Sequence, residues 1–154
     1  MISFIGEGGE SKVPASGMTA WNFQVKSKEA AKKKVRMKVG LETIPADAAE
    51  WSIRLYDATG GSMFDTHSSQ SQPEFDFFLE GARPKELRLE AHAPVGAAYK
   101  DKVIIKLEVC LVEFPTECDR LEFAAEARQS ILALKTSIGH EKDVADGISA
   151  KTKS

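Results

Sequence analysis

The regular alternation of apolar and polar residues along most of the chain is the feature that most limits its possible folds. Trp21, Phe23 and Val25 alternate with polar residues, and the same two-residue period returns in later segments. Successive side chains of a β-strand point to opposite faces of a sheet, so this period predicts strands with one buried face. The other segments with this period are 35–41, 51–55, 75–79, 87–91 and 103–111, and residues 2–5 are expected to add an edge strand.

Turn-forming sequences separate these segments. Pro14-Ala15-Ser16-Gly17 precedes the strand at Trp21, and the glycines of Asp57-Ala58-Thr59-Gly60-Gly61 follow the strand that starts at Trp51. Short strands at regular spacing, without helices between them, are typical of antiparallel sandwiches. We therefore predict a mainly β fold, an immunoglobulin-like antiparallel β-sandwich of about seven strands, over residues 1–114.

The apolar period changes after Pro115. Thr116 stands where a helix N-cap would be, Gly139 stands where a helix would end, and apolar residues recur between them at intervals of three and four. This pattern predicts an amphipathic C-terminal helix within 115–139, from about 117 to 138, followed by a polar, disordered tail at 140–154. The apolar stripe of this helix is Leu121, Ala124, Ala125, Ile131, Leu132 and Ile138.

The predicted stripe has to be buried against something. It can pack on its own sandwich, or it can pair with a second copy of the chain or with a groove on a partner. The second alternative makes these six residues the first candidate site for partner binding or self-association.

Three short sequence segments suggest a family. They are the turn at Pro14-Ala15-Ser16-Gly17, the strand Trp51-Ser52-Ile53-Arg54-Leu55, and Ala93-Pro94 ahead of the long strand at 103–111. With them, residues 13–112 resemble the immunoglobulin-like accessory modules of the NEW3 and CARDB type. The resemblance implies a spacer or binding platform without a catalytic motif. The chain departs from the family in two places. Tyr99-Lys100-Asp101 replaces the Gly-x-Tyr motif that usually leads into the last strand, and the predicted C-terminal helix lies outside the family pattern.

Charge points to one local feature. The formal net charge is −2, so no overall field attracts nucleic acid. If the apolar residues 35, 37 and 39 face the core, however, Lys34, Arg36 and Lys38 share the outer face of one strand. This positive stripe is a candidate site for an acidic partner, whereas the lack of interleaved aromatic residues disfavours nucleic acid. Solvated lysines that prevent edge-to-edge aggregation are the alternative interpretation.

We expect no catalytic residues, no metal and no cofactor. His67, His92 and His140 have no Cys or His three or four residues away, as zinc sites require. Asp65, His67 and the serines at 68, 69 and 71 are not part of a G-x-S-x-G elbow. The chain is therefore not expected to be an enzyme.

The two cysteines, Cys110 and Cys118, are too few for a disulfide framework. A bridge between them is geometrically possible, but two free thiols are the expectation. The N-terminal residues lack the basic and apolar regions of a signal peptide. We therefore expect a cytoplasmic location, with an exported parent chain as the alternative.

The sequence leaves two functions open. The first is a non-catalytic interaction or assembly module that binds a protein partner or self-associates. The second is a module that binds carbohydrate or an anionic polymer. In the second case Tyr56, Tyr99 and Phe64 are the candidate surface rings, because Trp21 and Trp51 are in phase with core residues.

Overall fold

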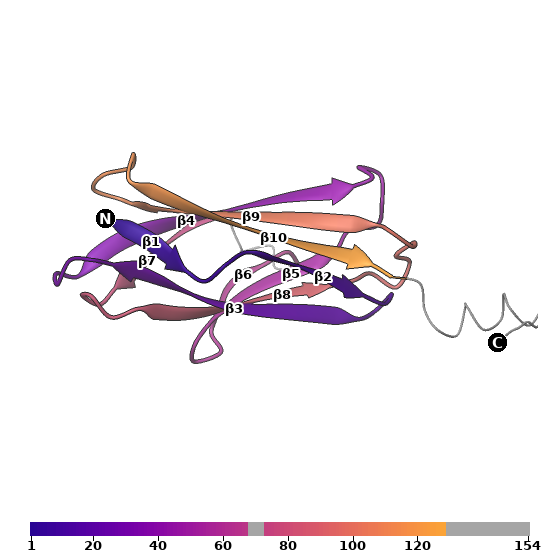
Figure 1. The fold of residues 1–154 in the computed structure, drawn as a ribbon, viewed down its shortest axis with the longest axis horizontal. Helices are drawn as coiled ribbons and strands as arrows, with labels where there is room; N and C mark the ends of the chain where they lie inside the picture. Colours follow the sequence, from indigo (N-terminus) through magenta and orange to yellow (C-terminus); the bar gives the residue numbers. More distant parts are fainter. Residues whose placement is uncertain (68–72, 129–154) are drawn as a thin grey trace, which may run out of the picture.

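The computed structural model describes residues 1–67 and 73–128. Within these residues ten strands form two five-stranded sheets that pack face to face (Figure 1). The first sheet has the order β1-β3-β8-β5-β6, and the second has the order β2-β10-β9-β4-β7. The strands are β1 (Ile2–Ile5), β2 (Gly9–Val13), β3 (Met18–Ser27), β4 (Lys33–Ile44), β5 (Ser52–Asp57), β6 (Ser62–Asp65), β7 (Glu74–Leu79), β8 (Lys85–His92), β9 (Lys102–Leu111) and β10 (Cys118–Ala127).

The predicted β-sandwich is confirmed, and every segment with a two-residue period forms a strand. The apolar phase of each strand points between the sheets, where it forms one continuous core. Fully buried members of this core are Val25, Met37, Ile53, Leu89 and Leu107. The number of strands exceeds the prediction because β2, β6 and β10 were not counted among the predicted strands. No helix in the described part of the chain is long and apolar enough to cross a membrane.

The N-terminal edge of the sandwich is divided between the two sheets. β1 pairs antiparallel with β3 in the first sheet, and β2 pairs parallel with β10 in the second. Gly6 adopts a φ of 126° where the chain crosses, and a Cβ at Gly8 would overlap the carbonyl oxygen of Glu122. The crossing therefore needs glycine at both positions, for its backbone freedom and for its small size.

The predicted C-terminal helix is wrong over its first part. Residues 118–127 form strand β10, which pairs antiparallel with β9 on one side and parallel with β2 on the other. The sandwich therefore extends to Ala127 instead of ending at residue 114. The remainder of the predicted helix and the tail at 140–154 lie outside the described residues.

Pairing and burial explain why a strand forms where helix propensity is high. Leu121, Phe123 and Ala125 are separated by Glu122 and Ala124, so this segment carries a partial two-residue period as well as a helical one. In the strand, Phe123 is 1% exposed. Its ring centroid lies 4.9 Å from that of Trp21 and 5.6 Å from that of Phe23, on the opposite sheet. Burial of this ring and two rows of strand hydrogen bonds outweigh helix propensities of a few tenths of a kcal/mol per residue.

Replacing the Phe123 side chain tests this arrangement. Phe123 is a core residue in the strand but lies outside the apolar stripe of the predicted helix. We expect Phe123→Ala to lower the free energy of unfolding by about 3–5 kcal/mol, as for other buried aromatic residues. Glu122→Ala, one residue away and exposed, should change it by less than about 0.5 kcal/mol. Urea unfolding curves measure both values, and similar small effects would contradict the strand.

Candidate functional site

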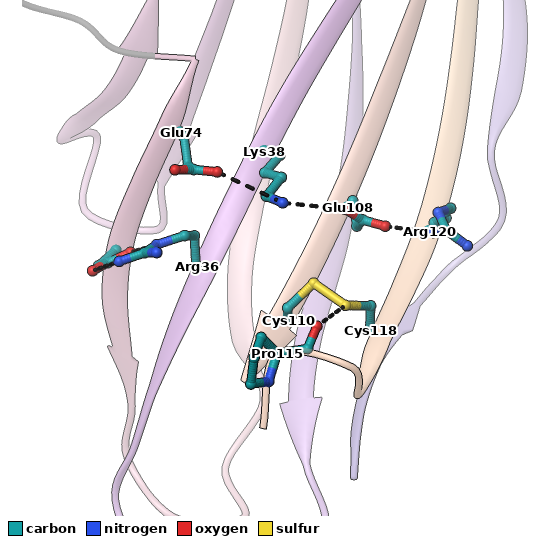
Figure 2. A network of polar contacts seen from close by, with 9 residues as sticks. Arg36, Lys38, Glu74, Glu108, Cys110, Pro115, Cys118 and Arg120 are labelled. Carbon is teal, nitrogen blue, oxygen red and sulfur yellow. Dashed lines mark hydrogen bonds and ion pairs between the residues drawn. A yellow bond between two sulfur atoms is a disulfide. The ribbon is translucent and has the colours of Figure 1, made fainter. Parts of the chain in front are cut away.

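Charged side chains and a disulfide lie together on the outer face of the second sheet (Figure 2). The register places Lys38 of β4 between Glu74 of β7 and Glu108 of β9, and Arg120 of β10 opposite Glu108. Two residues further along each of these strands, on the same face, Arg36 lies opposite Asp76 and Cys110, and Cys110 lies opposite Cys118. We call this surface the outer charged face. Its residues are Arg36, Lys38, Glu74, Asp76, Glu108, Cys110, Cys118 and Arg120.

A row of ion pairs crosses four strands of this face (Figure 2). Lys38 Nζ lies 3.7 Å from Glu74 Oε2 and 3.9 Å from Glu108 Oε1. Arg120 Nη2 lies 2.7 Å from the other carboxylate oxygen of Glu108. Glu108 is therefore held from both sides by cations. Opposite charges on neighbouring strands contribute about 0.2–1 kcal/mol per pair.

A second ion pair on this face is bidentate. Arg36 Nε and Nη2 donate hydrogen bonds to the two carboxylate oxygens of Asp76, at 2.7 and 3.0 Å. Lys34 Nζ lies 3.8 Å from Oδ2 of the same carboxylate. The hydrogen bonds from Arg36, and its charge, lower the pKa of Asp76 below its ordinary value.

These contacts change the interpretation of the predicted positive stripe. Lys34, Arg36 and Lys38 do share the outer face of β4, but each lies within 4 Å of a carboxylate. An acidic partner would have to displace Asp76 or Glu74, so its binding would gain little net electrostatic energy. The stripe is part of a charge-balanced face.

The expectation of free thiols is wrong, because Cys110 and Cys118 form a disulfide. The pairing register places them directly opposite each other, with their Cα atoms 4.1 Å apart. The bridge was the less favoured alternative because Cys118 was assigned to a helix, where it has no strand partner. The carbonyl oxygen of Pro115 lies 3.2 Å from Cys118 Sγ, within the turn that joins the two strands.

A second candidate surface is the loop at 93–101, which joins β8 to β9 at one end of the sandwich. It exposes two apolar side chains, Val95 at 85% and Tyr99 at 60%. Its backbone nevertheless makes several hydrogen bonds. Ala97 N donates to Pro94 O at 3.1 Å, and the nearly buried carboxylate of Asp101 accepts from Ala98 N at 2.9 Å.

This loop, which we call the 93–101 loop, is also tied to its neighbours. Lys100 N donates to Ala127 O at 2.9 Å, and Ala127 N donates to Asp101 O at 2.7 Å. Ala93 N donates to Gly17 O at 2.8 Å, which connects the loop to the turn before β3. The two exposed apolar side chains are thus presented on a fixed backbone. The exposure of Tyr99 agrees with its prediction as a surface ring, whereas Val95 was not among the candidate residues of the sequence.

The structure separates the other partner-binding residues that the sequence suggested. Leu121 is half-buried against the core, and Ala124 and Ala125 are buried in β10. These three residues therefore do not form a stripe on one helix face. Ile131, Leu132 and Ile138 lie outside the described residues, and their role in partner binding stays a prediction.

The remaining candidates do not form one cleft. Tyr56 lies on β5 of the first sheet, Phe64 is buried, and Tyr99 lies on the 93–101 loop. Asp65 accepts a hydrogen bond from the main-chain N–H of His67, at 2.9 Å. His92 Nε2 lies 3.0 Å from Glu90 Oε1 on the same strand.

Comparisons with known proteins establish the fold. No family model matches the sequence, and a search of the curated proteins finds no match. The N-terminal domain of PorA is similar in structure, with a TM-score of 0.52 and 13% identity over 81% of this chain and 97% of that one. A family 123 glycoside hydrolase from Clostridium perfringens gives a TM-score of 0.50 and 7% identity, over 84% of this chain but 27% of the hydrolase.

The PapD-like domain 7 of human CEP192 gives a TM-score of 0.43 and 10% identity, over 84% of each chain. At identities this low, similarity in structure speaks to the fold alone. The two packed sheets, in which the strands pair antiparallel except for β2 with β10, and the similarity to the PorA domain show that the chain has a general immunoglobulin-like β-sandwich fold.

The Arg36–Asp76 pair makes a contribution to stability that depends on pH. Because the folded state lowers the pKa of Asp76, this contribution is complete above the pKa of the unfolded chain, about 3.9. It is lost as the pH falls through the lower pKa of the folded state. We expect Asp76→Asn to lose less stability than the wild type on acidification, as measured by urea midpoints at a series of pH values.

The double-mutant cycle with Arg36→Gln supplies the control. In the Arg36→Gln background, Asp76→Asn should change the pH dependence much less, because the largest cause of the lowered pKa of Asp76 is gone. Equal pH profiles for the wild type and Asp76→Asn would contradict this role of the pair.

Proposed function

We propose that the chain is a non-catalytic immunoglobulin-like module that binds a protein partner or a second copy of itself through the 93–101 loop. The observation that carries this proposal is the exposure of Val95 and Tyr99 on a backbone fixed by hydrogen bonds. Apolar and tyrosine side chains that stand out on a rigid loop are typical of binding surfaces.

The fixed backbone matters because binding has an entropic cost. A loop that is ordered only on binding loses conformational freedom at that moment, and the loss weakens the complex. The contacts of Asp101, Lys100 and Ala127 hold the 93–101 loop before any partner arrives. Tyr99 can then contribute a large contact area at the cost of few side-chain rotations.

The alternative function, binding of carbohydrate or an anionic polymer, receives less support. Its predicted aromatic residues lie on separate surfaces, and the cations of the outer charged face are paired with carboxylates. A sugar site needs rings and polar groups that converge on one ligand.

Two narrower assignments remain predictions. The resemblance to NEW3 and CARDB accessory modules agrees with a binding platform, and membership of that group is part of our proposal. The cytoplasmic location also stays a prediction of the sequence.

Photo-crosslinking from the 93–101 loop tests the proposed surface. A benzoylphenylalanine at position 99 should crosslink to a second copy in the purified full chain, or to a partner in cells that produce the chain. Phe114 is the matched control position, because it is 53% exposed but lies in the loop at the opposite end of the sandwich. Crosslinks at position 114 but not at 99, or at neither, would overturn the proposal.

The affinity of the complex found in this way gives a second measurement. If Tyr99 is a central contact, Tyr99→Ala should weaken the complex by about 2 kcal/mol, or roughly thirtyfold. Phe114→Ala should leave the affinity unchanged. Sedimentation velocity measures both effects for self-association, and unaltered unfolding curves show that the loss is not caused by misfolding.

A further inference from the structure

Three side chains on the outer charged face bring metal-ligand atoms together. A carboxylate oxygen of Glu108 and the Sγ atoms of Cys110 and Cys118 all lie within 4.8 Å of one another. Glu108 and Cys110 are two residues apart on β9 and therefore point to the same side of the sheet. The antiparallel register then adds Cys118 from β10 (Figure 2).

In the disulfide, Sγ of Cys110 and Sγ of Cys118 are bonded to each other and neither is a thiolate that could bind a metal ion. In a reducing compartment, such as the cytoplasm that the sequence predicts, glutathione and thioredoxin systems keep such cysteines as thiols. We propose that, once this bridge is reduced, Glu108, Cys110 and Cys118 form a binding site for a divalent metal ion with the preferences of Zn²⁺. The inference does not depend on partner binding through the 93–101 loop.

The metal site forms in two chemical steps, reduction of the bridge and exchange of thiol protons for the metal ion. A dithiol reductant gives two electrons and two protons to the bridge, the Sγ–Sγ bond breaks, and the reductant becomes a disulfide. The metal ion then replaces the proton on each thiol, and two protons go to solvent. Oxidation of the two cysteines by another disulfide forms the Sγ–Sγ bond again and releases the metal ion. The other disulfide accepts the two electrons and leaves as two thiols once it has taken up two protons from solvent.

The ligand set favours zinc over harder cations. Thiolates are soft ligands that select Zn²⁺ and its chemical relatives, whereas Ca²⁺ and Mg²⁺ prefer sites made only of oxygen. Two thiolates and one carboxylate supply three of the four tetrahedral positions, and a water molecule takes the fourth. A small cavity of about 90 Å³ lies beside Cys110, with Arg36, Lys38 and Pro115 in its lining. Of the three proposed ligands, only Cys110 lines this cavity.

The surroundings of the three ligands support the same assignment. Arg120 and Lys38 hold the Glu108 carboxylate at 2.7 and 3.9 Å, and such outer contacts orient a ligating carboxylate. A zinc ion with two thiolates and one carboxylate carries a single net negative charge, which these cations offset. The Pro115 carbonyl, 3.2 Å from Cys118 Sγ, can accept a hydrogen bond from the thiol before the metal binds.

Reduction should leave the site assembled, because the bridge is not what pairs the strands. The β9–β10 ladder continues from Cys110↔Cys118 as far as Lys102↔Glu126. Beyond the cysteines, Leu111 N donates to Glu117 O at 3.2 Å and closes the turn. The positions of the three ligands are thus set by backbone hydrogen bonds that persist in the dithiol form.

Cobalt titration of the full chain tests the proposal. With the bridge reduced by a phosphine, we expect one Co²⁺ per chain, thiolate-to-cobalt charge-transfer absorption, and displacement by Zn²⁺. Zn²⁺ should also raise the Tm of the reduced chain. The oxidised chain has the same sequence and fold and should show none of these effects, so it is a control that does not depend on how a variant folds.

Two carboxylate variants identify the third ligand. Removal of a residue that only hydrogen-bonds to a metal ligand typically weakens metal binding about 10–100-fold. Glu108 is proposed as a ligand itself, so Glu108→Gln should weaken binding by at least about tenfold. Glu74→Gln is the matched control, since Glu74 also pairs with Lys38 but lies outside the ligand cluster. The proposal is overturned if the reduced chain binds no Co²⁺, if Cys110→Ser/Cys118→Ser retains the absorption, or if the two carboxylate variants bind alike.

Discussion

The pairing of β10 between β9 and β2 is the interaction on which the rest of the structure depends. It closes the second sheet against the N-terminal edge strand and buries Phe123 against two rings of the first sheet. The same strand places Cys118 opposite Cys110 and Arg120 beside Glu108. At its end, Ala127 anchors the 93–101 loop. Both candidate surfaces therefore rest on the position of one strand.

Much of the fold could be predicted from the sequence, because alternation is a local signal that survives without knowledge of the partner strand. The segments at Trp21, Val35 and Val103 each specify a buried face on their own. The segment at 118–127 could not be assigned in this way. Its alanines and glutamates satisfy a helical period and a strand period together, and only the space between β9 and β2 decides which one forms.

The candidate sites were less predictable, for a related reason. Sequence placed Lys34, Arg36 and Lys38 on one outer face, which is a property of a single strand. Whether such a stripe carries free charge depends on the residues opposite it, and Asp76, Glu74 and Glu108 come from strands far away in the chain. Exposure of Val95 likewise depends on how the loop is tied to Ala127 and Gly17, contacts that no local pattern encodes.

Register is the constraint that joins the core to the outer charged face. A shift of one residue between β9 and β10 would turn Cys118 toward the core and break the alignment of Arg120 with Glu108. Such a shift would also turn Phe123 out of the core, which would expose a large aromatic ring to water. Burial of Phe123 on the inner face thus keeps Cys118 and Arg120 on the outer face, and its ring contacts with Trp21 and Phe23 favour the register in which Glu108, Cys110 and Cys118 meet. The hydrophobic core determines not only the stability of this sandwich but also which polar side chains can act together on its surface.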